Sequence, residues 1–198
     1  MLKEHQHIID QIILNFPSLN LEIIQYLLKQ STLKEVKKKE IYIEAGTLDK
    51  NICIILKGMI RVYYVVNGEE KNIFFISENS TFACYESIIL DRPTNQYVDA
   101  IEDTLFLQIP HQAISKLEQS NINMSNTVNI WLKAELVQLI NRIERQVLWN
   151  VEQHYLYLLE ENPELLARIP QKHLASYLGI TPESLSRIRA RITKKGRK

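Results

Sequence analysis

The stretch that decides the fold of the C-terminal part reads Gln171-Lys-His-Leu-Ala-Ser-Tyr-Leu-Gly-Ile-Thr-Pro-Glu-Ser-Leu-Ser-Arg-Ile-Arg189. Its first half places apolar side chains at the three- and four-residue steps of an amphipathic helix. Gly179 can adopt the left-handed conformation that ends a helix. Thr181 is a good N-cap, and Pro182 suits the first position of a following helix. The pattern therefore predicts a helix, a tight turn and a second helix.

The second predicted helix, from Pro182 to about residue 193, separates its side chains by character. Leu185, Ile188 and Ile192 share one face at helical spacing, whereas hydroxyl and arginine side chains occupy the other. A second helix with a polar, basic outer face is typical of a recognition helix that enters the major groove of DNA.

The charge of the chain is concentrated at this end. The last 31 residues carry nine Lys or Arg and one acid, Glu183, whereas the other 167 carry 15 basic and 22 acidic residues. A formal net charge of +1 therefore hides a strongly basic segment, which is typical of nucleic-acid binding. The alternative is an ordinary helix pair with a solvated basic face. The tail Lys194–Lys198 is expected to add a salt-sensitive, nonspecific attraction to DNA.

The composition fits a globular, cytoplasmic protein. A chain of 198 residues with 45% apolar content can form one large domain or two modest ones. No apolar run approaches the roughly 18 residues of a membrane span, and residues 1–5 lack a signal pattern. Cys53 and Cys84 are expected to be reduced, packed thiols, with a disulfide as the alternative. His5 and His7 have no further ligand nearby, so no metal site is expected.

The central part of the chain predicts a β-structure. Short β-rich runs, separated by turn residues, occupy 40–44, 52–56, 59–66, 72–76, 82–90, 97–101 and 105–109. Asn67-Gly68 is a strong signal for a type I′ hairpin, because both residues tolerate a positive φ. Many short strands at regular spacing predict an antiparallel sandwich or jelly-roll barrel. Residues 5–30, interrupted by Pro17, are predicted to be helical.

A long helix is predicted from about 122 to 149, because this run contains neither Gly nor Pro. Ser120 or Asn121 is expected to cap it, and Asn150 to end it. Its apolar stripe either pairs with the same helix of a second copy or packs inside its own domain. The stripe contains Val128, Trp131, Leu132, Leu136, Leu139 and Ile143.

Together, these segments resemble the Crp/Fnr family of bacterial transcription regulators over nearly the whole chain. The stretch from Pro163 to Arg189 is most similar to the branch common in Bacteroidetes. The resemblance implies an α+β protein with an N-terminal jelly-roll, sensor-like domain over 1–120, preceded by N-terminal helices. It also implies a connecting and dimerisation helix over 121–149 and a winged-helix-type helix-turn-helix domain over 150–198.

The resemblance also implies which residues read DNA. The family's recognition helix carries an Arg-Glu-Thr-Val-x-Arg pattern, and the corresponding stretch here begins with Pro182, which has no side-chain donor. Glu183 and Arg187 are retained and are the main candidates for base contacts, with Ser184 beside them. The candidates for phosphate contacts, which position the protein without specifying sequence, are Gln171, Lys172, Thr181, Arg189 and Arg191.

The sensor-like domain lacks the residues that hold a cyclic nucleotide in related regulators. Those members use a Gly-Glu pair for the ribose and an Arg-Ser pair for the phosphate, and the comparable stretch, 80–100, contains neither. Binding of cAMP or cGMP is therefore not expected, and no cofactor is predicted. An uncharged or amphipathic effector is one alternative, and a barrel that only scaffolds a dimer is the other. The candidate pocket residues are Tyr64, Tyr85, Glu86, Asn95, Gln96 and Tyr97.

The sequence therefore predicts a homodimeric regulator that binds double-stranded DNA at an inverted repeat. RNA polymerase and an unidentified small molecule are further partners that the resemblance allows, and no membrane is expected. A cupin-type enzyme is the first alternative, but residues 31–110 contain no histidine to hold its metal. The second alternative is an interaction protein that kept the fold without specific DNA binding.

Overall fold

The computed structural model describes residues 8, 10, 12–13 and 16–195. Residues 8, 10, 12 and 13 are helical. The elements that follow are α2 (Leu21–Gln30), β1 (Thr32–Val36), β2 (Ile41–Ile43), β3 (Asn51–Lys57), β4 (Met59–Val66), β5 (Glu69–Ser77), β6 (Thr81–Ala83), α3 (Tyr85–Leu90), β7 (Tyr97–Ala100), β8 (Thr104–Pro110), α4 (His111–Ser120), α5 (Ile122–Leu148), α6 (Val151–Glu161), α7 (Pro163–Arg168), α8 (Gln171–Tyr177) and α9 (Pro182–Lys195). His5, His7 and the end of the basic tail, 196–198, lie outside the described residues.

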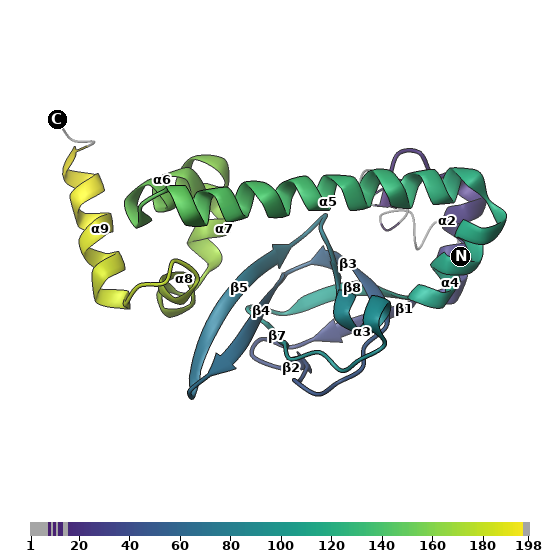
Figure 1. The fold of residues 1–198 in the computed structure, drawn as a ribbon, viewed down its shortest axis with the longest axis horizontal. Coiled ribbons are helices and arrows are strands. Elements are labelled where there is room, and N and C mark those ends of the chain that lie inside the picture. Colours follow the sequence, from purple (N-terminus) through teal and green to yellow (C-terminus); the bar gives the residue numbers. More distant parts are fainter. Residues whose placement is uncertain (1–7, 9, 11, 14–15, 196–198) are drawn as a thin grey trace. The chain divides into compact units, whose positions relative to one another are not determined.

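The strands form two four-stranded sheets, in the orders β1-β8-β3-β6 and β2-β7-β4-β5 (Figure 1). Within the first sheet, β8 pairs antiparallel with both β1 and β3. The rings of Tyr42 on β2 and Phe106 on β8 meet edge to face, with centroids 4.8 Å apart. Because these residues belong to different sheets, the contact joins the two layers. The predicted jelly-roll-like architecture is confirmed.

The hairpin between β4 and β5 turns at the predicted dipeptide. Asn67 has φ 53° and Gly68 has φ 81°, so both residues adopt the left-handed backbone that a type I′ turn requires. Gly58, between β3 and β4, has φ 92° and lies close to the backbone of Asp103. A Cβ atom placed there would lie 2.5 Å from the carbonyl oxygen of Asp103. Only glycine fits this turn without moving the backbone.

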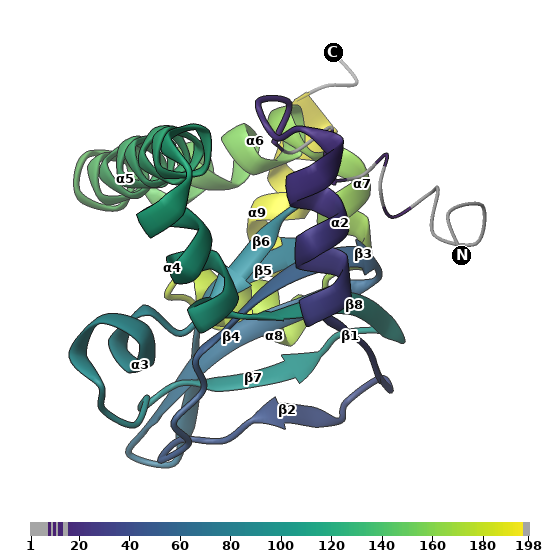
Figure 2. The same cartoon turned by 90° about the vertical axis from the view of Figure 1, so that its right-hand side faces the viewer.

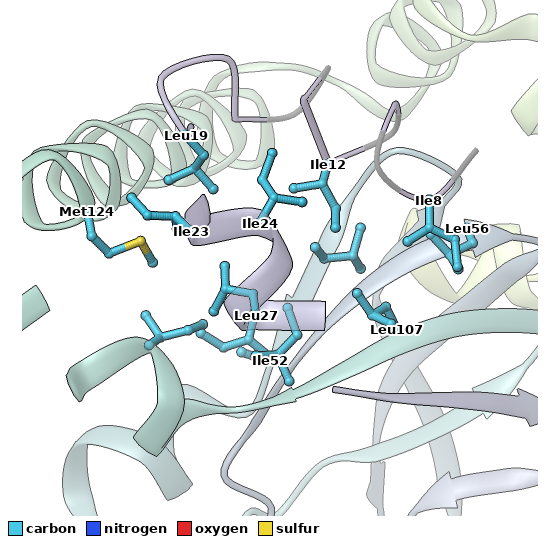
Figure 3. Close-up of a cluster of buried hydrophobic side chains, with 14 residues drawn as sticks. Ile8, Ile12, Leu19, Ile23, Ile24, Leu27, Ile52, Leu56, Leu107 and Met124 are labelled. Atoms are coloured by element: carbon cyan, nitrogen blue, oxygen red, sulfur yellow. The ribbon is translucent and has the colours of Figure 1, made fainter. Parts of the chain in front are cut away.

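Strand β3, in the interior of the first sheet, is buried on both faces. Successive side chains of a strand point to opposite faces, so Cys53 and Ile55 of β3 face the second sheet while Ile52 and Ile54 face the helices. Figure 2 shows α2 and α4 lying over this outer face. Side chains from α2, β3, β8 and the first turn of α5 form one hydrophobic cluster there (Figure 3).

By its contacts the chain divides into two compact units. Unit 1 comprises the described residues up to 62 and residues 75–135. Unit 2 comprises residues 63–74, at the tip of the β4–β5 hairpin, and residues from 136 onward. The predicted segment limits at 120 and 149 coincide with the ends of α4 and α5 to within one residue, whereas the compact units divide α5 after Glu135.

In unit 2, the hairpin tip is bonded to the helices. The Ser176 hydroxyl on α8 donates to the carbonyl oxygen of Glu70 (2.6 Å) and accepts from the amide of Asn72 (3.1 Å). The guanidinium of Arg142 lies 4.1 Å from the ring centroid of Phe74 and 5.1 Å from that of Tyr177. These contacts make the hairpin tip an integral part of unit 2. The described residues after Leu148 form helices and turns only, so the wing of the predicted domain is not among them.

Two local predictions differ from the structure. The run 82–90, expected to be a strand, instead contains β6 and the short helix α3, which ends at Asp91 in the left-handed conformation (φ 51°). Because aspartate tolerates that conformation, Asp91 can end a helix, and the apolar run alone did not indicate this helix. The strand β1 was not predicted, because four of its five side chains are exposed.

Candidate nucleic-acid interface

The turn between α8 and α9 is closed by backbone hydrogen bonds. The amide of Ile180 donates to the carbonyl of Ala175 (3.0 Å), and the amide of Gly179 donates to that of Ser176 (3.1 Å). These two bonds, with Gly179 at φ 69°, form a Schellman motif that satisfies the last carbonyls of α8. The predicted role of Gly179 is therefore confirmed.

The start of α9 also follows the sequence pattern. The Thr181 hydroxyl accepts a hydrogen bond from the amide of Ser184 (3.3 Å), as an N-cap does. Pro182 occupies the first helical position. Leu185 is fully buried, as are Leu174 and Ala175 of α8. The small side chain of Ala175 allows the two helices to approach closely, so α9 is held firmly on α8.

The three candidates for base contacts lie together in the first turns of α9. Glu183 and Arg187 are exposed, and Ser184 is partly exposed between them. Arg187 Nη2 donates to Ser184 Oγ (3.0 Å), which lies 3.3 Å from Thr181 Oγ1. A bond to its own backbone amide, a bond from Thr181 and the charge of Arg187 lower the pKa of Glu183, so its carboxylate is ionised at neutral pH. The site therefore offers one anionic acceptor and one cationic donor to solvent.

The candidates for phosphate contacts are placed differently. Gln171 Nε2 donates to the carbonyl of Pro182 (2.8 Å) and to Ser186 Oγ (2.7 Å), so this side chain ties α8 to α9. Arg189 Nε donates to Tyr155 Oη (3.2 Å). Arg191 forms an ion pair with Glu152, so both arginines also fasten α9 to α6. Lys172 is exposed at the start of α8.

The stripe predicted for dimerisation lies largely on the surface of α5. Leu132, Leu136, Leu139 and Ile143 are each exposed by 43% or more. Trp131 is partly covered by Phe16 and Tyr85, and Val128 packs on the hydrophobic cluster of unit 1. The exposed apolar surface continues to Val147, which is 74% exposed. Only two of the described side chains of this 27-residue helix are buried, which is unusual for a helix in a protein core.

The six candidate effector residues belong to different elements and loops. The ring of Tyr85 on α3 lies against Trp131, with centroids 6.2 Å apart, whereas the neighbouring Glu86 accepts from Arg92 Nη2 (2.6 Å). Asn95 is exposed, and Gln96 and Tyr97 are half-buried in and after the loop that precedes β7. Tyr64 belongs to unit 2.

The second sheet holds a buried charged pair that the sequence analysis missed. Arg61 on β4 and Asp99 on β7 are 4% and 8% exposed. Arg61 Nε donates to Asp99 Oδ1 and Arg61 Nη2 donates to Asp99 Oδ2, each over 2.7 Å. This bidentate geometry satisfies both carboxylate oxygens. The signal was an arginine and an aspartate inside the otherwise apolar strand runs 59–66 and 97–101.

Both cysteines are free and buried, in agreement with the predicted reduced thiols. Tyr42 Oη lies 3.6 Å from Cys53 Sγ, and Gln108 Nε2 donates to the same hydroxyl (3.1 Å). Burial raises the pKa of each thiol to about 12, so neither is a reactive thiolate at neutral pH.

No group of three or more metal-ligating side chains occurs among the residues that the structure describes. Within the same residues, no helix combines the length and the apolar character needed to span a membrane.

The family profile described as cyclic nucleotide-binding domain matches residues 33–121. No curated protein sequence matches the chain. The fold is similar to that of several solved structures. A CooA variant from Carboxydothermus hydrogenoformans is 18% identical, with a TM-score of 0.69 over 89% of this chain and 84% of that one. FixK2 from Bradyrhizobium japonicum is 16% identical, with a TM-score of 0.70 over 84% of this chain and 86% of that one.

A third similar structure is CLP of Xanthomonas campestris, described as a c-di-GMP responsive global regulator that links cell–cell signaling to virulence gene expression. It is 13% identical, with a TM-score of 0.69 over 89% of this chain and 93% of that one. At these identities the similarity establishes a shared architecture, namely the jelly-roll-like domain, the long helix and the helices that follow.

Proposed function

We propose that the chain is a homodimeric transcription regulator that reads an inverted repeat in double-stranded DNA with α9. The observation that carries this proposal is the exposure of Glu183 and Arg187 at the start of a helix that is fastened to both α8 and α6. A carboxylate can accept from the amino group of cytosine, and a guanidinium can donate to O6 and N7 of guanine. Rigid placement of both groups is what base readout requires.

The α5 stripe supports the homodimer. Exposed leucine, isoleucine and valine side chains recur along its length at helical spacing, and a second copy of the same helix would bury them in an isologous contact. A two-fold dimer would place two α9 helices in successive major grooves, with half-sites about 34 Å apart.

The charges of unit 1 argue against a cyclic nucleotide as effector. The barrel has two arginines, Arg61 and Arg92, and each already bonds a carboxylate. A phosphate bound to this domain would have to displace a carboxylate from one of these two arginines or go without a guanidinium partner, and desolvation of an unpaired phosphate is costly. We therefore propose a regulator whose DNA binding does not require cAMP or cGMP.

The test is selection of bound duplexes from a random library at a stated salt concentration, without and with added cAMP. An Arg187→Ala variant runs in parallel, with Arg92→Ala, which removes an exposed arginine of unit 1, as the matched control. We expect one inverted repeat to be enriched by the parent protein and by the control, equally with and without cAMP, and to be lost with Arg187→Ala. Salt-sensitive binding with no enriched sequence, under either condition, would overturn the proposal.

The dimer is tested separately by light scattering coupled to gel filtration. Leu139→Lys places a charge on the exposed stripe, and Lys133→Glu changes a charge on the same helix without removing an apolar side chain. We expect dimers for the parent protein and the Lys133 variant, and monomers for the Leu139 variant. A parent protein that stays monomeric at micromolar concentration would exclude the proposed arrangement.

A further inference from the structure

The hydrophobic layer of unit 1 contains a cavity of about 130 Å³. It lies between the outer face of the first sheet and the helices that cover it. Ile52, Ile54 and Ile109 contribute from the strands, Ile88 from α3, and Val128 and Trp131 from α5. Figure 3 shows other lining side chains, among them Leu27 and Met124, within the cluster.

This cavity is distinct from the barrel interior. The β3 side chains that line it, Ile52 and Ile54, alternate with Cys53, whose sulfur lies near Tyr42 on the opposite sheet. The cavity is therefore on the helical side of the first sheet, whereas the Arg61–Asp99 pair joins two strands of the second sheet. None of Arg61, Asp99, Cys53 and Cys84 lines it.

The chemistry of the lining is almost wholly apolar. Three aromatic side chains meet on one side, with the ring centroid of Trp131 6.4 Å from Phe16 and 6.2 Å from Tyr85. The buried hydroxyl of Thr127 is already used, since it donates to the carbonyl of Asn123 (2.8 Å) and lies 2.8 Å from Ser18 Oγ. The two titratable lining residues outside this aromatic group, His111 and Glu118, are partly exposed. A charged ligand would thus find no buried counter-charge on the lining.

We propose that this cavity binds a small uncharged ligand, aromatic or short aliphatic, of about six to nine non-hydrogen atoms. A dry cavity of similar volume, lined by Leu, Ile and Phe, holds benzene in another protein. The aromatic group around Trp131 offers ring contacts, and the aliphatic floor excludes water. Because Thr127, Val128 and Trp131 belong to α5, a bound ligand would contact the first half of the long helix directly. The proposal does not depend on DNA binding.

The test uses Trp131 as the reporter and bromobenzene, whose bromine quenches indole fluorescence on contact, as the probe. The chain has two tryptophans, and Trp149 is outside the lining, so Trp149→Phe leaves a single reporter. We expect saturable quenching with a stoichiometry of one per chain. Quenching that rises linearly with bromobenzene and never saturates would overturn the proposal.

Two variants in the Trp149→Phe background locate the site. Val128→Phe fills the cavity and should weaken binding by about tenfold or more, whereas Ile130→Phe makes a similar change on the same helix at an exposed position outside the lining. Ile88→Ala enlarges the cavity and should shift preference from bromobenzene toward 1-bromonaphthalene, a gain that a misfolded protein cannot show. Equal weakening by both phenylalanine variants, or no shift with Ile88→Ala, would overturn the site.

The same titration is repeated over a hundredfold range of protein concentration. A dissociation constant that stays unchanged supports a small-molecule site within one chain. A dissociation constant that rises as the protein associates would indicate that a side chain of a second copy occupies the cavity, and it would overturn the proposal.

Discussion

Arg61 on β4 and Arg187 on α9 are side chains of the same type in opposite environments, one buried and one exposed. Arg61 is buried and holds both oxygens of Asp99, so its charge is neutralised inside the fold. Arg187 is exposed, its hydrogen bond goes to the neutral hydroxyl of Ser184, and the carboxylate of Glu183 acts on it only through its charge. A buried guanidinium that is bonded by both oxygens of a carboxylate stabilises the fold, whereas an exposed one on a helix is available to a partner.

Breaking the buried pair should have the largest effect on stability. Asp99→Asn leaves the Arg61 guanidinium buried without a counter-charge, and we expect a loss of about 3–5 kcal/mol in the free energy of unfolding. Urea denaturation followed by circular dichroism measures it. The double variant Arg61→Met with Asp99→Leu should recover most of the loss, because apolar side chains of similar volume need no counter-charge. A single variant as stable as the parent protein would contradict the structural role of the pair.

A second effect concerns His154, which has two arginines as neighbours. Burial, Arg145 and Arg142, in that order, lower the pKa of His154, and its Nε2 atom is buried without a hydrogen-bond partner. The unfolded chain therefore takes up a proton more readily than the folded protein as the pH falls below about 6.5. We expect unit 2 to lose stability between pH 7.5 and 5.5, by less than the loss from Asp99→Asn.

The measurement is the urea midpoint of the parent protein and of His154→Gln at both pH values. The variant should show a smaller decrease between pH 7.5 and 5.5 than the parent protein. A parent protein that becomes more stable over the same interval would show that the folded state holds the proton more tightly, contrary to the environment of His154.

A third, smaller effect is expected where a cation is paired at the surface. Arg191→Ala removes the ion pair with Glu152, in which the arginine side chain is 54% exposed. Solvent screens such a pair, so the loss should be at most about 1 kcal/mol. Urea titration at low and at 1 M salt would reveal it as a difference that disappears at high salt. A difference that persists at 1 M salt would indicate that packing of α9 on α6, not charge, accounts for it.

The smallest effect on stability is expected at Arg187. Arg187→Ala removes an exposed side chain with one bond to Ser184, so the free energy of unfolding should change by no more than about 0.5 kcal/mol. Affinity for the selected DNA should nevertheless fall about 5- to 150-fold, the equivalent of one bidentate base contact of about 1–3 kcal/mol. Competition binding at fixed salt measures this fall. A loss of stability as large as that from Asp99→Asn would make Arg187 a structural residue.

Local signals explain which parts of the fold could be predicted. The positive φ of Asn67, Gly68 and Gly179 follows from residue type alone. Caps also act within a few residues, so Asn121 caps α5 through the amides of Asn123 and Met124. Asn150, expected to end α5, instead opens α6 through a capping box with Gln153.

The missed features depend on contacts between distant residues. Arg61 and Asp99 are 38 positions apart, and only the pairing of β4 with β7 brings them together. Similarly, Gln171 was predicted to bind phosphate from its place at the start of α8, but its amide reaches Ser186 on α9. The number of basic residues on α9 could be read from the sequence. Which arginines are bonded to α6 and which are open to solvent could not, because that depends on which face of α9 packs on α6.

The length of α5 has a mechanical consequence. At a rise of 1.5 Å per residue, its 27 residues make a lever arm about 40 Å long, without a Gly or Pro at which it could bend. A tilt of about 5° about one end would displace the other end by about 3.5 Å, close to the rise of one base pair. A displacement too small to disturb side-chain packing near Val128 would thus become, at Leu148, a shift about as large as the rise of one base pair.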